Sequence, residues 1–578
     1  MLGLLLAATL AGALTFDRRS WPGLVGDEAT YLMQAESLAW DFDARYSRRD
    51  YDRFVAHWGQ KPDGLILQSG DGGRTLVYAK PASYALWIAP FVRLSPLRGA
   101  AVANALLLAL AAVTAARALE RRLGPAAPLW VAAWIFGSVA FAYIFWAHSD
   151  LFLMCLVAIA LALAYGGPRD SPGQDKPDEA PGRTALRWTA AGLLLGLVFV
   201  ARPFYGTLLV PAALAALAAT AAKVLPAPRR RLGIAALVAG AAVAILGSGL
   251  THLAEADSWT PYSGQRQSFS AATGFPAVDL PPESWGQRGA GRGNRSWLPS
   301  DMVGPRLTAW NALYFLAGRD VGILPYYLPL LLGLLAFRRG EGRGTLILAA
   351  LAAMACFLLT RPFNFYGGGG AIANRYFLPV YPAFWFAAGR PARARWALLI
   401  LALAAPFLAP LWRHPRAFFL DEDSGYRYVA AAARRLLPFE TTQSHLKPAG
   451  GEDFVQNGLW IKPLATGVRA EAGGIRIEPA GGELLVGSPR PLPGLRLITL
   501  PPAPAIGAIE ISGAEVKASH PRPGGGSVFL LRLGRPRAVH RMWWSEDENP
   551  FYLYQLRLKA PAGFTFQLQP TREQGTDR

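Results

Sequence analysis

Two adjacent carboxylates, Asp27 and Glu28, follow directly on an apolar run at the N-terminus of the chain. A carboxylate beside a membrane either begins a helix, where acids favour the first turn, or acts as a general base that deprotonates a hydroxyl nucleophile. A third acid, Asp150, stands where a later apolar segment begins, and its alternative role is that of a helix cap. Asp27, Glu28 and Asp150 are therefore the candidate catalytic residues.

Cationic side chains next to loops form the second candidate group. Lys80 precedes Pro81, Arg375 follows the glycine run 367–370, and Arg202 stands at an Arg-Pro helix break. Arginine binds phosphate through a planar fork, and lysine binds it as a point charge. We expect these three cations to bind the phosphate of a lipid, although interfacial cations also commonly extend towards lipid headgroups.

The polar and aromatic residues adjoining these acids and cations are candidate substrate-binding residues: Tyr31, Tyr84, His148, Asn374 and Tyr376. The glycine run lacks the Lys-Ser/Thr of a nucleotide loop, and neither a dinucleotide fingerprint nor a Ser-His-Asp signature is present. A substrate activated for transfer should therefore already be carried in the membrane. The histidines lack metal-ligand spacing, so we expect no cofactor, with a divalent metal held by the acids as the alternative.

The chain has 578 residues, of which 52% are hydrophobic, and a formal net charge of +19. Apolar runs near ~20 residues are typical of membrane-spanning helices, and their number here predicts about eleven spans. The expected spans are 2–16, 98–119, 129–146, 151–165, 188–201, 205–222, 233–253, 325–337, 345–360, 377–388 and 396–412.

Arginine and lysine cluster in alternate loops between these runs, which favours a membrane protein over a nucleic-acid-binding one. The basic loops are 120–124, 167–187, 223–231, 338–343 and 390–395. The positive-inside rule makes these loops cytoplasmic, so the N-terminus is expected inside the cell and the C-terminus outside. Asp27, Lys80, Asp150 and Arg375 then share the outer face of a cell inner (plasma) membrane.

Residues 1–412 are expected to form a multi-pass α-helical membrane domain, with external loops at 17–97 and 254–307. Within the first loop, 27–40 has the pattern of an amphipathic helix, which predicts a helix that lies on the membrane surface. This arrangement would bring the candidate acids and cations to one membrane face.

The remainder of the chain has a different composition. Residues 413–450 read as a polar connector. Residues 451–578 alternate polar and apolar side chains between Gly and Pro turns, which predicts an external β-sandwich.

The order of these motifs resembles that of a known superfamily. Asp27-Glu28 after the first span, Lys80-Pro81 before the second, Asp150 after the third and the late sequence Asn374-Arg375-Tyr376-Phe377-Leu378-Pro379 are similar to the integral membrane GT-C glycosyltransferases. The closer likeness is to the branch that contains the protein O-mannosyltransferases and the lipid A aminoarabinose transferase. The resemblance covers residues 1–412, and Lys80 departs from the family pattern because Pro81 is followed by Ala82 instead of a second proline.

The resemblance implies a hexosyl or pentosyl transferase of the cell envelope that uses a polyprenyl-phosphate-linked sugar as donor. Asp27 would position or deprotonate an acceptor hydroxyl, Asp150 would be the second acid, and Lys80 and Arg375 would contact the donor phosphate. The reaction would be an inverting single displacement at the outer face. The expected partners are the donor, membrane lipids and a glycan, lipid or protein acceptor, with no nucleic acid.

Two other readings remain open at this point. A transporter or flippase of lipid-linked sugars would carry functional charges near the bilayer midplane and broken helices. A non-catalytic membrane scaffold would use its external sandwich to bind glycan.

Overall fold

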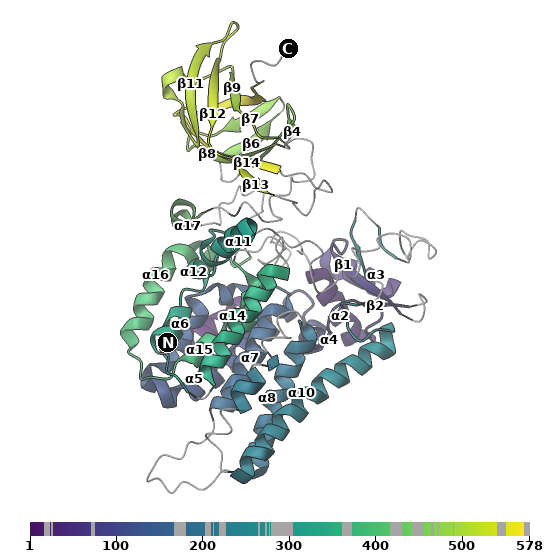
Figure 1. Ribbon diagram of the computed structural model, residues 1–578. Helices are drawn as coiled ribbons and strands as arrows, with labels where there is room; N and C mark the ends of the chain where they lie inside the picture. Colours follow the sequence, from purple (N-terminus) through teal and green to yellow (C-terminus); the bar gives the residue numbers. More distant parts are fainter. Residues whose placement is uncertain are drawn as a thin grey trace. The chain divides into compact units, whose positions relative to one another are not determined.

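The computed structural model describes residues 1–16, 24, 27–70, 75–166, 181–202, 210–211, 213–218, 227–263, 266–271, 274–276, 278, 305–340, 342–360, 373–416, 430–438, 440, 455–463, 467–471, 473–488, 490–539 and 551–571. The chain divides into two compact units (Figure 1). The helical unit comprises Met1–Met302, Gly322–Arg361 and Ala373–Arg416, and the C-terminal unit comprises Val303–Val321, Pro362–Ile372 and Ala417–Arg578. The glycine run 367–370 and most of the expected span 205–222 lie outside the described residues.

The helical unit is built from α-helices, short 3-10 helices and one small sheet (Figure 1). Its helices are α1 (Leu2–Thr15), α2 (Glu28–Trp40), α3 (Arg48–Trp58), α4 (Ala82–Leu94), α5 (Gly99–Leu123), η3 (Gly124–Ala126), α6 (Ala127–Phe136), η4 (Val139–Phe145), α7 (Ser149–Tyr165), α8 (Pro181–Ala201), α10 (Ala227–Ala256), α12 (Ile323–Tyr326), α13 (Leu330–Leu335), α14 (Arg343–Thr360), η6 (Arg375–Val380), α15 (Pro382–Ala387) and α16 (Ala394–Arg413). Its antiparallel sheet has the order β2-β1-β3, with strands β1 (Leu65–Gly70), β2 (Thr75–Tyr78) and β3 (Arg266–Phe269).

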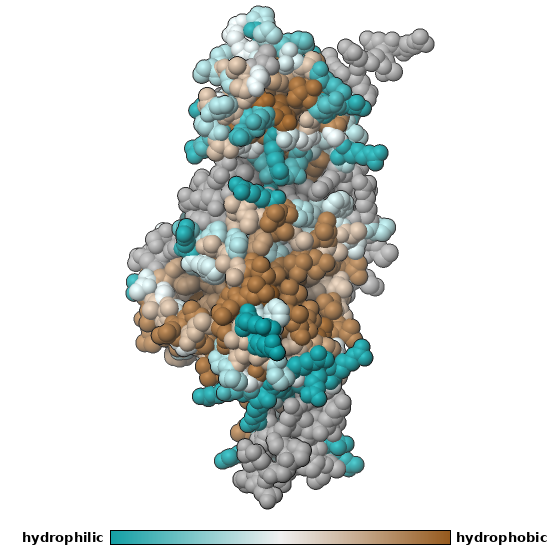
Figure 2. Space-filling view, turned by 90° about the vertical axis from the view of Figure 1, so that its left-hand side faces the viewer, coloured by the Kyte–Doolittle hydropathy of each residue, from teal (hydrophilic) through white to brown (hydrophobic). Residues whose placement is uncertain are grey.

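Five helices among the described residues are long and apolar enough to cross a membrane. These candidate spans are Gly99–Phe136, Pro181–Ala201, Arg230–Ala256, Arg343–Thr360 and Ala394–Arg413. Two shorter apolar helices, Leu2–Thr15 and Ser149–Tyr165, accompany them. In Figure 2, hydrophobic side chains cover a broad area of the helical unit. The chain is thus a membrane protein, but the predicted count of about eleven spans is not confirmed.

Three of the expected spans are interrupted. Residues 129–146 form α6 and then η4, residues 325–337 include α12 and α13, and residues 377–388 form η6 and then α15. Each piece is too short to cross a bilayer alone, since a spanning helix needs about 20 residues.

Buried aromatic side chains satisfy carbonyl groups near these interruptions. Trp134 Nε1 donates to Pro329 O at 2.8 Å, and Tyr381 OH donates to Trp134 O at 3.1 Å. Tyr327 OH donates to Asn374 O at 2.8 Å. Irregular backbone at membrane depth is tolerated only where protein groups satisfy it, and these bonds supply such partners.

The prediction that 27–40 lies on the membrane surface is wrong. Every residue of α2 from Glu28 to Ser37 is buried, including the polar side chains of Thr30, Gln34 and Glu36. The helix is covered by α3, α4 and β1. The spacing of apolar residues gave the wrong prediction because the polar side chains of α2 have hydrogen-bond partners inside the unit. Thr30 Oγ1, for example, accepts from Ile66 N at 2.9 Å.

The C-terminal unit contains α11 (Pro305–Ala317), α17 (Ala431–Leu436) and two six-stranded sheets. The first sheet joins β10-β14-β8-β5-β4, with β13 on β14, and the second has the order β11-β12-β9-β15-β7-β6. The strands are β4 (Val455–Gln456), β5 (Leu459–Pro463), β6 (Val468–Glu471), β7 (Gly474–Ile477), β8 (Gly482–Ser488), β9 (Gly494–Leu500), β10 (Glu510–Ser512), β11 (Ala514–Pro521), β12 (Ser527–Leu533), β13 (Arg537–Val539), β14 (Phe551–Lys559) and β15 (Phe564–Pro570).

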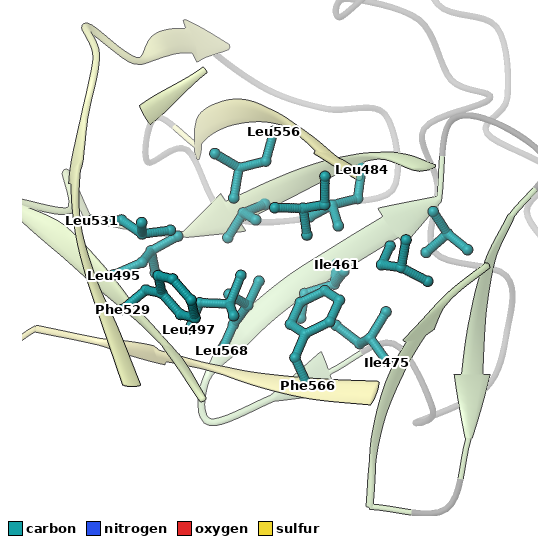
Figure 3. Packing of buried hydrophobic residues seen from close by; sticks show 14 of the residues in the cluster. Ile461, Ile475, Leu484, Leu495, Leu497, Phe529, Leu531, Leu556, Phe566 and Leu568 are labelled. Atoms are coloured by element: carbon teal, nitrogen blue, oxygen red, sulfur yellow. The ribbon is translucent and has the colours of Figure 1, made fainter. Parts of the chain in front are cut away.

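The two sheets share one apolar core. Leu484 and Leu556 extend from the first sheet, and Leu497, Phe529 and Phe566 extend from the second (Figure 3). This arrangement is the sandwich that the alternating pattern predicts.

A buried acid pair lies elsewhere in the C-terminal unit. Glu440 Oε1 accepts from the backbone N–H groups of Asp320 and Val321 at 2.8 and 2.9 Å. Burial raises the pKa of Asp320, although neighbouring Arg319 opposes the shift. Burial and the charge of Asp320 raise the pKa of Glu440 well above its usual value. Arg319 pairs with Glu483 at 3.3 Å.

Close helix packing gives the first testable prediction. Along the contact of α8 and α10 (Figure 1), a Cβ at Gly240 would lie 2.1 Å from Thr189 O, whereas a Cβ at Gly247 on the same helix meets nothing within 4 Å. Gly240→Ala should lower the free energy of unfolding by about 1–3 kcal/mol through overpacking, and Gly247→Ala should not. Thermal unfolding in detergent measures both, and equal effects would contradict this packing.

The acid pair predicts a pH dependence. Because its pKa values are raised, the folded unit keeps protons that the unfolded chain has released, so its stability falls as pH rises from the ordinary carboxyl range of about 4. Asp320→Asn should flatten that fall, by about 1.4 kcal/mol for each unit of raised pKa. Melting temperatures of the full chain at pH 5 to 8, followed by circular dichroism, measure it. Glu510→Gln, at an exposed position, is the control and should not change the profile.

Candidate active site

The centre of the candidate site is the ion pair between Asp27 and Lys80. Asp27 is the N-cap residue of α2, and Lys80 stands directly before Pro81, which is the N-cap of α4. Lys80 Nζ donates to Asp27 Oδ2. The Lys80 side chain is 3% exposed and that of Asp27 is 21% exposed, so the carboxylate is the member of the pair that retains access to solvent.

The electrostatic environment keeps Asp27 ionised. Burial alone would raise its pKa, but Lys80, Arg375 and His148 together outweigh burial and hold the pKa well below its usual range. Burial lowers the pKa of Lys80 to about 7, although the charge of Asp27 opposes the shift. Lys80 therefore exchanges its proton near neutral pH, while Asp27 stays negatively charged.

Asp150 lies in the first turn of α7 and is fully buried. Its Oδ1 accepts from Arg202 at 3.3 Å, and its Oδ2 accepts from Arg375 NH1 at 3.3 Å. One carboxylate thus holds two guanidinium groups from separate parts of the chain. The structure thus brings together three of the predicted site residues: Asp150, Arg202 and Arg375.

His148 contacts the same arginine. Arg375 NH1 lies 2.7 Å from His148 Nδ1, and since the guanidinium is a donor only, Nδ1 is the acceptor. Burial, followed by the charge of Arg375, lowers the pKa of His148 to about 3. The ring is accordingly neutral at physiological pH and acts as an acceptor that orients Arg375.

The local fold of η6 explains where Arg375 points. Asn374 caps this 3-10 helix by accepting a hydrogen bond from Tyr376 N at 3.0 Å. The Tyr376 ring lies between two cations, with the guanidinium of Arg202 5.3 Å and that of Arg375 5.2 Å from its centre. Such contacts are favourable, and they become stronger when water is excluded.

Tyr31 and Tyr84 are buried beneath these charges. Tyr31 OH lies 2.9 Å from Ser149 Oγ, and its ring packs edge-on against Tyr84 at 5.3 Å. Tyr84 OH donates to Asn104 Oδ1 at 3.3 Å. Lys80 Nζ lies 5.7 Å from the centre of the Tyr31 ring. Both tyrosines therefore support Lys80 and the start of α7, and neither presents its ring at a surface.

Glu28 binds an arginine that is not among the predicted site residues. Both its carboxylate oxygens bind Arg416, and neither side chain is exposed. Sequence reasoning missed Arg416. The available signal was its charge, because an arginine just beyond the last expected span, on the side that the sequence predicts to be external, departs from the positive-inside rule.

Arg266 and Tyr262 are further site residues that sequence reasoning missed. Arg266 on β3 donates to Ala79 O at 3.2 Å, next to Lys80, and lies 5.2 Å from the centre of the Tyr262 ring. Its charge acts on Lys80 and lowers the pKa of that lysine. The position of Arg266 depends on the pairing of β3 with β1, residues almost 200 apart in the chain, and no local pattern reveals that pairing.

A cavity adjoins Lys80. Its volume is about 240 Å³, and it lies between the start of α4 and the helices α8 and α10. Both polar and apolar side chains line it, among them Gln34, Lys80, Ser83, Leu197, His252 and Trp259. A mixed lining of this kind fits a molecule with a charged end and an apolar end.

In the described part of the chain, no group of three or more His, Cys, Asp and Glu side chains is placed to hold a metal ion. The expectation that the chain uses no metal therefore remains an expectation.

The chain was compared with known proteins. No family model matches it, and no curated protein matches it. Two solved structures do, both of ArnT from Cupriavidus metallidurans, one bound to undecaprenyl phosphate and one in the apo state. The sequence identities are 18% and 16%, the TM-scores are 0.40 and 0.41, and each match covers 73% of this chain and 67% of the other.

At TM-scores below 0.5 these matches carry no argument about this chain, and its proposed function rests on the geometry of its own site.

Proposed function

We propose that this chain is a glycosyltransferase that moves a sugar from a polyprenyl-phosphate donor to an acceptor hydroxyl at the outer face of the membrane. The observation that carries the proposal is the charge of the site. Four cationic side chains surround two carboxylates in its described part, and all four are buried or partly buried: Lys80, Arg202, Arg266 and Arg375. A desolvated excess of positive charge favours a bound anion, and a phosphate fits both the arginine forks and the lysine.

The cavity beside Lys80 supports a lipid-linked phosphate. With the phosphate at Lys80, the apolar side chains that line the cavity, among them Leu86 on α4 and Leu197 and Val200 on α8, contact the prenyl chain. Apolar area removed from water stabilises such binding by roughly 25 cal/mol per Å². The sugar attached to the phosphate then lies on the side of Asp27.

The reaction is a single displacement with inversion. The acceptor oxygen attacks the anomeric carbon, the bond between that carbon and the phosphate oxygen breaks, and the hydroxyl proton passes to Asp27. Polyprenyl phosphate departs with an added negative charge, which Lys80 and the arginines stabilise. Preorganised charges of this kind cost no reorganisation at the moment of reaction.

Donor binding also prepares the base. Lys80 holds Asp27 as a carboxylate of low pKa, which is a weak base. When the donor phosphate takes the ammonium group of Lys80, Asp27 loses its nearest cation and its pKa rises. A carboxylate whose pKa lies nearer to the working pH is the more effective proton acceptor.

The broken helices are the one observation that favours a transporter of lipid-linked sugars, because transporters place their sites at such interruptions. Here the groups that bind the carbonyls near the interruptions are the neutral side chains of Trp134, Tyr327 and Tyr381. The described charged cluster includes one of these interruptions, because η6 begins at Arg375. It also pairs an acid, Asp27, with a cation, Lys80, which is the combination that a displacement at a phosphate-linked sugar requires. Enzyme chemistry is therefore the better account.

Replacing the base separates these two functions. Asp27→Asn should lower the rate of sugar transfer by about 10²–10⁴ and leave lipid binding in place. The assay incubates purified protein with a panel of polyprenyl-phosphate sugars and measures released polyprenyl phosphate. Asp52→Asn, at an exposed position on α3, is the control and should retain full activity. Transfer that persists in the Asp27 variant would remove Asp27 from the mechanism.

The lowered pKa of Lys80 predicts how donor affinity depends on pH. Lys80 attracts phosphate only when protonated, so affinity for the diester donor should fall as pH rises through about 7, by up to roughly tenfold per pH unit. Lys80→Arg stays protonated and should remove this dependence. Donor KM measured from pH 6 to 9 tests the effect, and the same fall in the Arg variant would assign the titration to another group.

A further inference from the structure

The pair formed by Glu28 and Arg416 has the geometry of a strong, dry ion pair. Arg416 NH1 lies 2.9 Å from Glu28 Oε1, NH2 lies 3.0 Å from Oε2, and both side chains have no exposed surface. A buried charge that loses its partner is strongly unfavourable, whereas a complete pair is tolerated. Since water does not reach either side chain, neither is placed to touch a substrate.

Glu28 connects the start of α2 to the segment that precedes α7. It follows Asp27 directly, and its Oε1 also accepts from the backbone N–H of Ala147 at 2.7 Å. Ala147 is the residue before His148. One carboxylate therefore links the backbone that carries Asp27 to the backbone that carries His148 and Asp150.

Arg416 adds a third segment to this junction. It lies just after α16, and its NH1 donates to Phe145 O at 3.1 Å. Its guanidinium lies 4.9 Å from the centre of the Trp146 ring, and Trp146 Nε1 donates to Pro415 O at 3.1 Å. The segment that follows α16 thus contacts Phe145 and Trp146, the two residues that precede Ala147.

Asp27 depends on this junction for its position. Its side chain makes no capping hydrogen bond to α2, so the end of the helix that carries it is anchored through the next residue, Glu28. Lys80 holds the Asp27 carboxylate in the structure, and the proposed reaction requires Lys80 to turn to phosphate. Two connections between the start of α2 and the segment around α7 then remain: the Glu28–Arg416 pair and the hydrogen bond between Tyr31 OH and Ser149 Oγ. The Glu28–Arg416 pair is the one made by the residue next to Asp27.

We propose that Glu28 and Arg416 are positioning residues, which hold Asp27 at a fixed separation from the segment that carries His148 and Asp150. This inference rests on the proposed transferase function. In that function Asp27 accepts the proton of the acceptor hydroxyl, and the arginines that bind Asp150 stabilise the departing phosphate. It reassigns Glu28, a candidate catalytic residue by sequence, to a role that acts through Asp27.

Three variants of the full-length protein test the proposal. Glu28→Gln should lower kcat by about 10²-fold, the effect of a small misplacement of a catalytic group, with donor KM changed less than threefold because the cations are untouched. The double variant Glu28→Met with Arg416→Met should regain part of the melting temperature that Glu28→Gln loses, because no unpaired charge is left buried, although Ala147 N–H and Phe145 O lose a partner; kcat should stay low. Arg416→Lys keeps the positive charge but loses the two-pronged guanidinium contact. Its kcat should therefore lie between that of Glu28→Gln and that of the wild type.

A matched control comes from the same external region. Asp41 pairs with Arg53 at the end of α2, far along the helix from Asp27. Asp41→Asn breaks an ion pair that is less buried than Glu28–Arg416 and should leave kcat within twofold of the wild type. A double Met variant with wild-type kcat would overturn the proposal, because the pair would then be purely structural. Arg416→Lys without any loss of kcat would overturn it too.

Hydrogen exchange provides a readout that needs no activity. In Glu28→Gln, amide exchange should increase together in residues 27–34 and 145–150. An increase in only one of the two segments, or in neither, would overturn the positioning role. If the wild type transferred no sugar from any donor, the proposed function would fail, and the exchange experiment would still decide whether this pair ties the two segments together.

Discussion

Charge removed from water must be compensated, and this requirement determines how the site is built. Lys80 is compensated by Asp27, and the two guanidinium groups of Arg202 and Arg375 are compensated by the single carboxylate of Asp150. The site keeps a net positive charge, because its described cations outnumber its described acids. Such an imbalance favours the binding of an anion.

Interrupted helices deliver the side chains to this site. A continuous span over 377–388 would leave Arg375 in a loop, whereas η6 begins at Arg375 itself and is capped by Asn374. The carbonyl of Asn374 is in turn satisfied by Tyr327. Buried aromatic donors thus allow an irregular backbone inside the helical unit, and the irregular backbone directs a guanidinium group towards Asp150.

Local patterns predicted much of this arrangement. Charge counting in loops predicted that Asp27, Lys80, Asp150 and Arg375 would meet, and period-two alternation predicted the sandwich strands. The burial of α2, the pairing of Arg416 with Glu28 and the approach of Arg266 to Lys80 were not predictable in this way. Each depends on contacts between residues far apart in the sequence, such as the register between β1 and β3, and no window of neighbouring residues encodes them.

The central claim is that one anionic lipid phosphate binds where Lys80 and Asp27 now pair. The most direct test is a cryo-EM structure of the full-length protein with polyprenyl phosphate added. The account predicts phosphate density within hydrogen-bonding distance of Lys80 Nζ, with the prenyl chain in the cavity beside α8 and α10 and with the Lys80–Asp27 contact opened. Phosphate density at any other place, with that ion pair intact, would contradict the account.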